Sequence, residues 1–123
     1  MRIRISWPAG SIEGNLNDTA TANKVSEALP VQGKANTWGD EVYFTLAINT
    51  QLEADAAEVV DPGTICYWVQ GTALALPFGP TPVSERDECR LVTAVNVLGK
   101  LDGDPKVLGT IQAGDTVSVE AVE

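Results

Sequence analysis

Residues 66–84 read Cys66-Tyr-Trp-Val-Gln-Gly-Thr-Ala-Leu-Ala-Leu-Pro-Phe-Gly-Pro-Thr-Pro-Val-Ser84, an apolar segment that runs into a proline-rich loop. A first strand, predicted from Thr64 to Val69, has apolar side chains on both faces and is expected to be buried on both. After a turn at Gln70-Gly71-Thr72, large and small side chains alternate from Ala73 to Phe78. The alternation predicts a hairpin strand with a large face and a small face. Only one of them can fill the inside of a closed sheet, and small side chains facing inward would leave room there.

The loop after this hairpin, Gly79-Pro80-Thr81-Pro82, is expected to be stiff. Pro77 cannot donate a ladder hydrogen bond, and Pro80 and Pro82 each fix one backbone angle, so strand pairing is expected to stop near Phe78. Both X-Pro bonds of the loop can adopt the cis form, and the sequence does not decide between the isomers.

The flanking sequence predicts one helix and further short strands. The helix is expected from Thr19 to Leu29, capped by Asp18 and ended by Pro30. The clearest strand alternation runs from Val42 to Asn49. The segment from Leu52 to Val60 is ambiguous and is expected to be a loop with a short helical turn. Other strands are predicted at Arg2 to Ser6, Ile12 to Leu16, Val31 to Thr37, Leu91 to Leu101 and Thr116 to Val122.

About eight strands joined by short connections indicate the fold class. We predict a mainly β fold, a closed or nearly closed eight-stranded barrel with one short α-helix. One or two helical turns are also expected, one of them from Glu85 to Cys89 with Ser84 as its cap. A barrel of eight strands holds side chains or one small ligand in its interior.

Length and composition fit one soluble domain. Residues 1–123 are predicted to form a single domain, since a chain of this length can build one core without staples. No apolar run approaches the roughly 20 residues that cross a bilayer, and the first six residues alternate instead of forming a signal peptide, so a cytoplasmic location is expected. The net charge of −9 repels phosphates and anionic lipids, so neither nucleic acid nor a membrane is an expected partner. The oligomeric state is left open.

Several chemistries are excluded by residue type. The chain has no histidine, which excludes Ser-His-Asp and Cys-His nucleophile systems and histidine-based zinc sites. The two cysteines, Cys66 and Cys89, are too few for a structural zinc site and are expected to be free in an intracellular chain. A phosphate-binding glycine loop is also lacking. We therefore expect no metal and no cofactor.

The order of several short motifs resembles one family. The motifs are Ala28-Leu29-Pro30, Trp38-Gly39-Asp40-Glu41-Val42-Tyr43-Phe44, Pro62-Gly63, Tyr67-Trp68, Phe78-Gly79-Pro80-Thr81-Pro82-Val83-Ser84 and Asn96-Val97-Leu98-Gly99-Lys100. In this order, over residues 15 to 122, they resemble a family of small uncharacterised prokaryotic proteins described as cyclophilin-like. The resemblance implies a cyclophilin-like eight-stranded barrel, and it implies no settled activity. True cyclophilins are prolyl isomerases that use an arginine beside a phenylalanine, with glutamine, histidine and tryptophan nearby, and this set is not recognisable here.

A cluster of aromatic and polar residues remains as the candidate ligand-binding site. Its members are Trp38, Glu41, Tyr43, Tyr67, Trp68, Phe78 and Thr81. The alternative is structural: the aromatic residues fill the core, Glu41 occupies a solvated hairpin position, and Thr81 is an ordinary loop residue.

Two functions from different classes are compatible with this cluster. The first is a binding module that holds a small molecule or an extended peptide at an aromatic-lined barrel face. The second is a peptidyl-prolyl cis-trans isomerase, which needs an apolar proline pocket and a donor aimed at the prolyl nitrogen. Arg86 and Arg90 are the candidate donors, and Phe78 is the candidate floor of the pocket. The sequence favours the binding module because that function needs no catalytic group that is missing.

Overall fold

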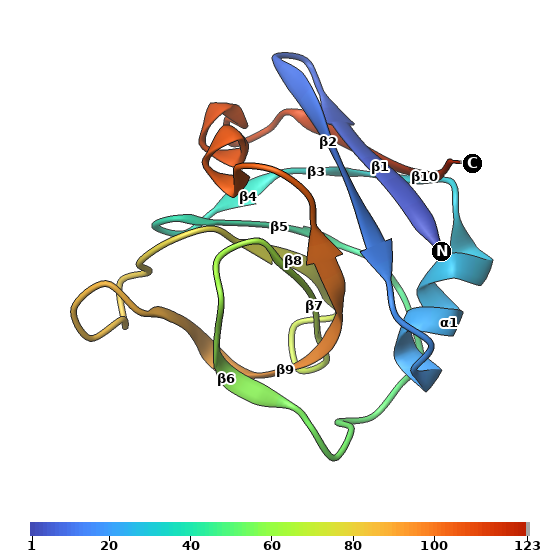
Figure 1. Ribbon diagram of the computed structural model, residues 1–123, viewed down its shortest axis with the longest axis horizontal. Helices are drawn as coiled ribbons and strands as arrows, with labels where there is room; N and C mark the ends of the chain where they lie inside the picture. Colours follow the sequence, from blue (N-terminus) through green and yellow to red (C-terminus); the bar gives the residue numbers. More distant parts are fainter. Residues whose placement is uncertain (123) are drawn as a thin grey trace.

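The computed structural model describes residues 1–122, which form ten strands, one α-helix and one 3-10 helix (Figure 1). The strands are β1 (Arg2–Trp7), β2 (Gly10–Leu16), β3 (Val31–Lys34), β4 (Asn36–Thr37), β5 (Glu41–Thr45), β6 (Ala57–Val60), β7 (Thr64–Trp68), β8 (Ala73–Pro77), β9 (Cys89–Leu101) and β10 (Thr116–Ala121). The helices are α1 (Ala20–Ala28) and η1 (Pro105–Thr110). The predicted mainly β class with one short α-helix is confirmed, although the number of strands is ten instead of eight.

The strands form one curled antiparallel sheet. Its order is β3-β10-β1-β2-β9-β7-β8-β5-β4, and β6 pairs with β9 off this path. The two ends of the path, β3 and β4, follow each other in the chain with only Ala35 between them. Within the part of the chain that the structure describes, no hydrogen-bonded ladder joins these two ends, so full closure of the barrel is not confirmed. The Phe44 ring packs directly against Gly33, so β3 and β5 meet there through side-chain packing.

The large face of β8 fills the inside of the curled sheet. Leu74 and Leu76 are fully buried in the main core. Ala75, on the opposite face, is also buried, but it belongs to a second, smaller apolar cluster with Cys66, Leu91 and Val95. The space left by the small side chains of β8 therefore lies outside the main core, not inside it.

We call this second apolar cluster the outer cluster. It forms because β9 is long enough to pair with two parts of the sheet. Its residues 96–101 pair with β7 and β2, whereas its residues 89–95 pair with β6. Register shifts occur in both of its pairings, and such bulges bend a strand. We call residues 89–95 the β9 arm; Leu91 and Val95 of this arm pack on Cys66 and Ala75, so the arm covers the outer face of β7 and β8.

The N-cap of α1 differs from the sequence-based prediction, whereas the helix ends before Pro30 as predicted. The N-cap is Thr19, whose hydroxyl accepts from the Ala22 amide at 3.3 Å, whereas the Asp18 carboxyl binds the Asn23 side chain. The Leu29–Pro30 bond after the helix is cis. Among residues 1–122 it is the only cis bond, so both X-Pro bonds of the loop after β8 are trans.

The chain between β5 and β6 is mostly irregular. The predicted strand from Val42 to Asn49 ends at Thr45, because beyond it the backbone binds the Tyr67 hydroxyl, which donates to the Leu46 carbonyl at 2.7 Å. The segment from Leu52 to Val60 was expected to be a loop with a helical turn. It contains strand β6, which pairs with the β9 arm.

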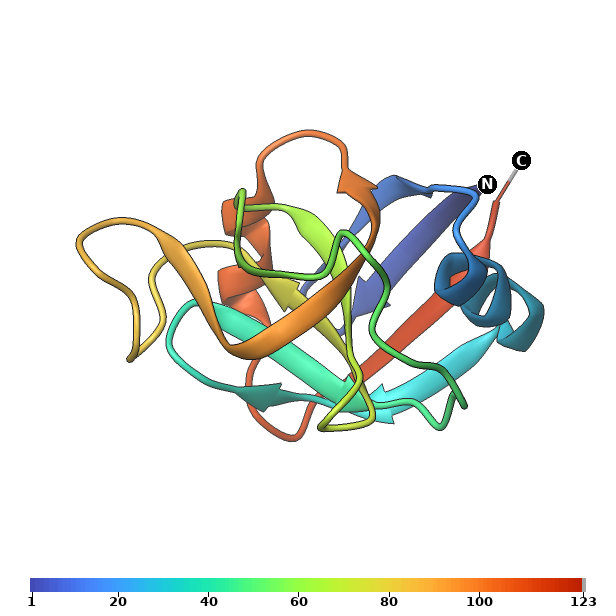
Figure 2. The same ribbon diagram turned by 90° about the horizontal axis from the view of Figure 1, so that it is seen from below.

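The predicted helical turn from Glu85 to Cys89 is not formed. The Ser84 hydroxyl instead accepts from the Thr81 and Arg90 amides, at 2.8 Å and 3.1 Å, and so ties the loop to the start of β9. The segment between β8 and β9 projects from the side of the molecule opposite α1 (Figures 1 and 2). No helix within residues 1–122 has the length and apolar character needed to cross a membrane.

Candidate functional site

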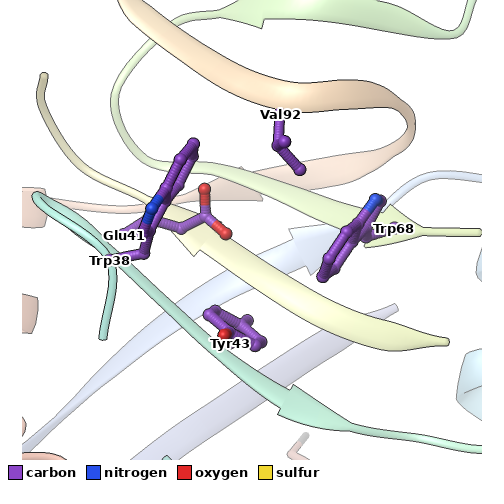
Figure 3. Close-up of a pocket in the computed structure, with 5 residues that line it drawn as sticks. All are labelled: Trp38, Glu41, Tyr43, Trp68 and Val92. Carbon is purple, nitrogen blue, oxygen red and sulfur yellow. The ribbon is translucent and has the colours of Figure 1, made fainter. Parts of the chain in front are cut away.

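A pocket of about 200 Å³ opens between the outer face of the sheet and the β9 arm (Figure 3). It is lined by Trp38, Glu41, Tyr43, Trp68 and Val92. Four of these five residues belong to the cluster predicted from the sequence. The fifth, Val92, lies on the β9 arm and is 50% exposed.

Strand geometry brings the lining residues together. Glu41 and Tyr43 are two residues apart on β5 and therefore point to the same face. In the register of the sheet, Tyr43 lies opposite Ala75, and Ala75 lies opposite Cys66. Small side chains at these two positions leave space beside Tyr43, and Trp68, two residues beyond Cys66, closes the far side.

The aromatic walls are held in place. The rings of Tyr43 and Trp68 meet edge to face, with centroids 5.9 Å apart and planes at 88°. The Trp68 indole donates from Nε1 to the Thr93 hydroxyl at 2.6 Å, which ties this wall to the β9 arm. The Gly71 backbone packs so closely on the indole ring that a side chain there would collide with it. Trp68 is therefore fixed from two sides.

Glu41 provides the acidic group of the pocket. Its side chain is 4% exposed, and its Oε1 is buried without a hydrogen-bond partner among residues 1–122. The carboxyl points into the space between Trp38 and Trp68 (Figure 3). Burial raises the pKa of Glu41 from 4.5 to about 7. The expectation of a solvated hairpin position was wrong: Glu41 is buried, and it shares the lining of the pocket with Val92 of the β9 arm.

The turn that carries Trp38 and Glu41 is supported by the loop after β8. Gly39 has a φ of +59°, and a side chain there would approach Thr81 Cα to 2.9 Å. The Asp40 amide donates to the Pro80 carbonyl at 2.9 Å, and the Phe78 amide donates to the Asp40 carbonyl at 2.8 Å. The proline-rich loop therefore supports the turn through contacts with Gly39 and Asp40.

Three of the predicted site residues lie elsewhere. Tyr67 is buried in the main core, where its hydroxyl binds the chain between β5 and β6. Phe78 is half-buried and packs against the same core. Thr81 is buried, and its hydroxyl donates to the Arg90 carbonyl. None of the three lines the pocket. Val92 gave no signal in the sequence, because its role depends on the position of the β9 arm.

The two arginines considered as isomerase donors do not line the pocket. The Arg90 guanidinium pairs with Glu88 at 2.6 Å and with Glu58 at 3.6 Å. Arg86 lies in an exposed turn with a φ of +60°. Neither arginine is therefore among the residues that line the space between the aromatic walls.

The thiols next to the pocket are free but chemically quiet. Cys66 and Cys89 are both buried and unpaired, as the sequence predicted. Burial, and secondarily the Glu41 charge, raises the pKa of Cys66, and burial raises the pKa of Cys89 to about 11. Neither thiol forms a thiolate readily at neutral pH. The described residues 1–122 contain no group of three or more Cys, Asp and Glu side chains that could hold a metal ion.

Known proteins place this architecture in a family. Residues 1–120 match the family described as cyclophilin-like. The solution structure of the hypothetical protein AF2241 from Archaeoglobus fulgidus is similar, with 35% identity and a TM-score of 0.82 over 99% of this chain and 95% of that chain. No curated protein matches the chain. The match over nearly the whole length confirms the resemblance seen in the sequence: the chain belongs to the cyclophilin-like family.

Proposed function

We propose that this protein is a binding module that holds a small molecule, or one side chain of an extended peptide, in the pocket of Trp38, Glu41, Tyr43 and Trp68. The observation that carries the proposal is the pocket itself: three aromatic residues surround one buried polar group that lacks a partner. Binding sites for small ligands combine apolar, often aromatic walls with a few polar groups that orient the ligand.

The size of the pocket limits the ligand. Its volume of about 200 Å³ is below the roughly 300 Å³ at which sites for drug-sized ligands begin. It exceeds the cavity of about 150 Å³ that accepts a benzene molecule. A ligand group with the size of one amino-acid side chain therefore fits.

The placement of the arginines favours binding over prolyl isomerisation. An isomerase needs a donor beside the apolar pocket, and the guanidinium of Arg90 is held by Glu88 and Glu58. Phe78, the expected floor of a proline pocket, packs against the main core. Ligand binding uses only groups that line the pocket.

Screening with small fragments by NMR tests the proposal. The chain has three tryptophans, and their indole N–H signals report on two locations: Trp38 and Trp68 line the pocket, whereas Trp7 donates to Thr110 at another site. We expect fragments that shift the Trp38 and Trp68 signals and leave the Trp7 signal in place.

A matched pair of variants controls this experiment. Val92, on the β9 arm, is half-exposed, and Val92→Phe fills the mouth of the pocket. Val83→Phe makes the same change at a residue that is 43% exposed and does not line the pocket. Binding is expected to be lost in Val92→Phe and retained in Val83→Phe. A library without a single such fragment, or equal binding by both variants, would refute the proposal.

A further inference from the structure

We infer that the ligand group is a protonated amine with at least one N–H, which lies between Trp38, Tyr43 and Trp68 and donates a hydrogen bond to the Glu41 carboxylate. This inference rests on the proposed function, and it specifies the chemistry of the ligand.

The first argument is the unpaired acceptor. Glu41 Oε1 is buried and has no partner among the described residues, and the side chain is 4% exposed. A buried carboxylate that lacks donors destabilises the protein, and a donor that enters the pocket beside Glu41 reduces this penalty. The residue opposite Glu41 on β8 is Pro77, which has no amide hydrogen to offer. A ligand that enters the pocket can supply a donor to this carboxylate.

The second argument is the aromatic wall. A cation over the face of a tryptophan or tyrosine ring is attracted by the ring's negative face, and the attraction grows when water is excluded. Two tryptophans and one tyrosine surround the Glu41 carboxyl. A neutral donor such as a hydroxyl would bind the Glu41 carboxylate but would gain little from these rings. An ammonium group uses both features.

The third argument is charge. The residues that line the pocket include no lysine or arginine. The titratable groups around Glu41 are the Asp40 carboxyl and Tyr43 hydroxyl on its own segment, the Cys66 thiol on β7 and the Cys89 thiol on the β9 arm. None of them is a cation, and the chain as a whole carries a charge of −9. Anionic ligands are repelled, and cations are attracted.

Binding of such a cation competes with protonation of Glu41. The neutral carboxyl, favoured by burial, attracts an ammonium group less than the carboxylate does. With the pKa of Glu41 at about 7, affinity is expected to be about tenfold weaker near pH 6 than near pH 8. The alkylammonium itself stays protonated over this range, as a lysine side chain does.

The test compares three probes of similar size: butylammonium, 1-butanol and tetramethylammonium. Their dissociation constants are measured from the shifts of the Trp38 and Trp68 indole signals. Butylammonium is expected to bind about tenfold more tightly than 1-butanol, because only the cation gains from the rings and the carboxylate. Tetramethylammonium, which has no N–H, is expected to bind more weakly than butylammonium.

Two variants identify the group that causes this preference. Glu41→Gln removes the charge from the pocket and is expected to abolish both the preference for butylammonium and its pH dependence. Glu27→Gln makes the same change in net charge on the exposed side of α1 and is expected to leave both unchanged. A capped tripeptide with a central lysine separates the two sources of an ammonium group: tighter binding than butylammonium identifies a peptide ligand, and weaker binding identifies a free amine.

The outcomes separate this inference from the proposed function. Equal affinity for butylammonium and 1-butanol at the indole signals would overturn the ammonium inference but leave a functional pocket. A preference for butylammonium that survives in Glu41→Gln would also overturn it. Absence of binding by all probes would overturn the inference, and absence of binding across the fragment library as well would overturn the proposed function.

Discussion

Replacing Glu41 by glutamine should change how the stability of the protein depends on pH. The carboxyl of Glu41 is buried, and burial raises its pKa from 4.5 to about 7. The folded protein therefore binds this proton more tightly than the unfolded chain does. The resulting contribution to the free energy of unfolding is full below about pH 4.5 and is lost as the pH rises through about 7.

The size of the effect follows from the two pKa values. A rise from 4.5 to about 7 corresponds to about 3 kcal/mol of stability that is present in acid and absent in mild alkali. Glutamine has nearly the same shape but does not titrate in this range, so it removes the pH dependence. Its amide also needs partners in the pocket, which costs about 1–3 kcal/mol at every pH. Only the change with pH therefore reports on the Glu41 proton.

Urea unfolding of the wild type and Glu41→Gln at about pH 5 and about pH 8.5 measures this change. The gain is the change in the free energy of unfolding of the variant from about pH 5 to about pH 8.5 minus the same change in the wild type. For Glu41→Gln this gain is expected to be about 2–3 kcal/mol. Glu27→Gln, on the exposed surface of α1, serves as the control and should show a gain near zero. A stability difference between Glu41→Gln and the wild type that does not vary with pH would refute the argument, since it would mean that Glu41 titrates as it does in the unfolded chain.

Three further predictions concern the core, the thiols and catalysis. Leu76→Ala is expected to lower the free energy of unfolding in urea by about 2–5 kcal/mol, because Leu76 is fully buried. Tyr43→Ala, at the half-buried pocket wall, should lower it by less than about 1 kcal/mol. Equal losses in the two variants would make Tyr43 a structural residue. Cys66 and Cys89 should react slowly with iodoacetamide in the folded protein and quickly in urea, because burial disfavours both thiolates, and fast labelling of the folded chain would contradict this. A protease-coupled assay should show prolyl isomerisation at the background rate, and a protein-dependent rate that Arg90→Ala abolishes would restore the isomerase hypothesis.

The local pattern of the chain predicted the hairpin and most of the strands. The segment around Tyr67 is apolar on both strand faces, and the segment around Leu74 alternates large and small side chains; both signals depend only on neighbours in the sequence. The turn at Gln70-Gly71-Thr72 was also visible for this reason. The end of β5 at Thr45 could not be predicted in this way, because it depends on the hydroxyl of Tyr67, which lies 22 residues further along the chain.

The candidate site was predicted in part. The sequence grouped Trp38, Glu41, Tyr43 and Trp68, and the structure places all four around one pocket. It could not predict that the room left by small side chains such as Ala75 lies outside the main core. That outcome depends on the path of the β9 arm, which is set by bulged pairings between segments far apart in the sequence.

The strongest sign of function is Glu41, which is buried although the sequence predicted a solvated position. A carboxyl on a hairpin is ordinarily solvated, and the alternation around Glu41 gave no reason to expect otherwise. Its burial without a partner costs stability, and a glutamine or an apolar residue at this position would avoid the cost of burying a charge. Folding alone does not require this arrangement, since the β9 arm is held by Leu91 and Val95 on the outer cluster and by the hydrogen bond of Thr93 to Trp68. Departures from good local design concentrate at functional sites. An unsatisfied acid between fixed aromatic walls is such a departure, and the ligand that satisfies it is the one that the titrations with butylammonium and 1-butanol are designed to identify.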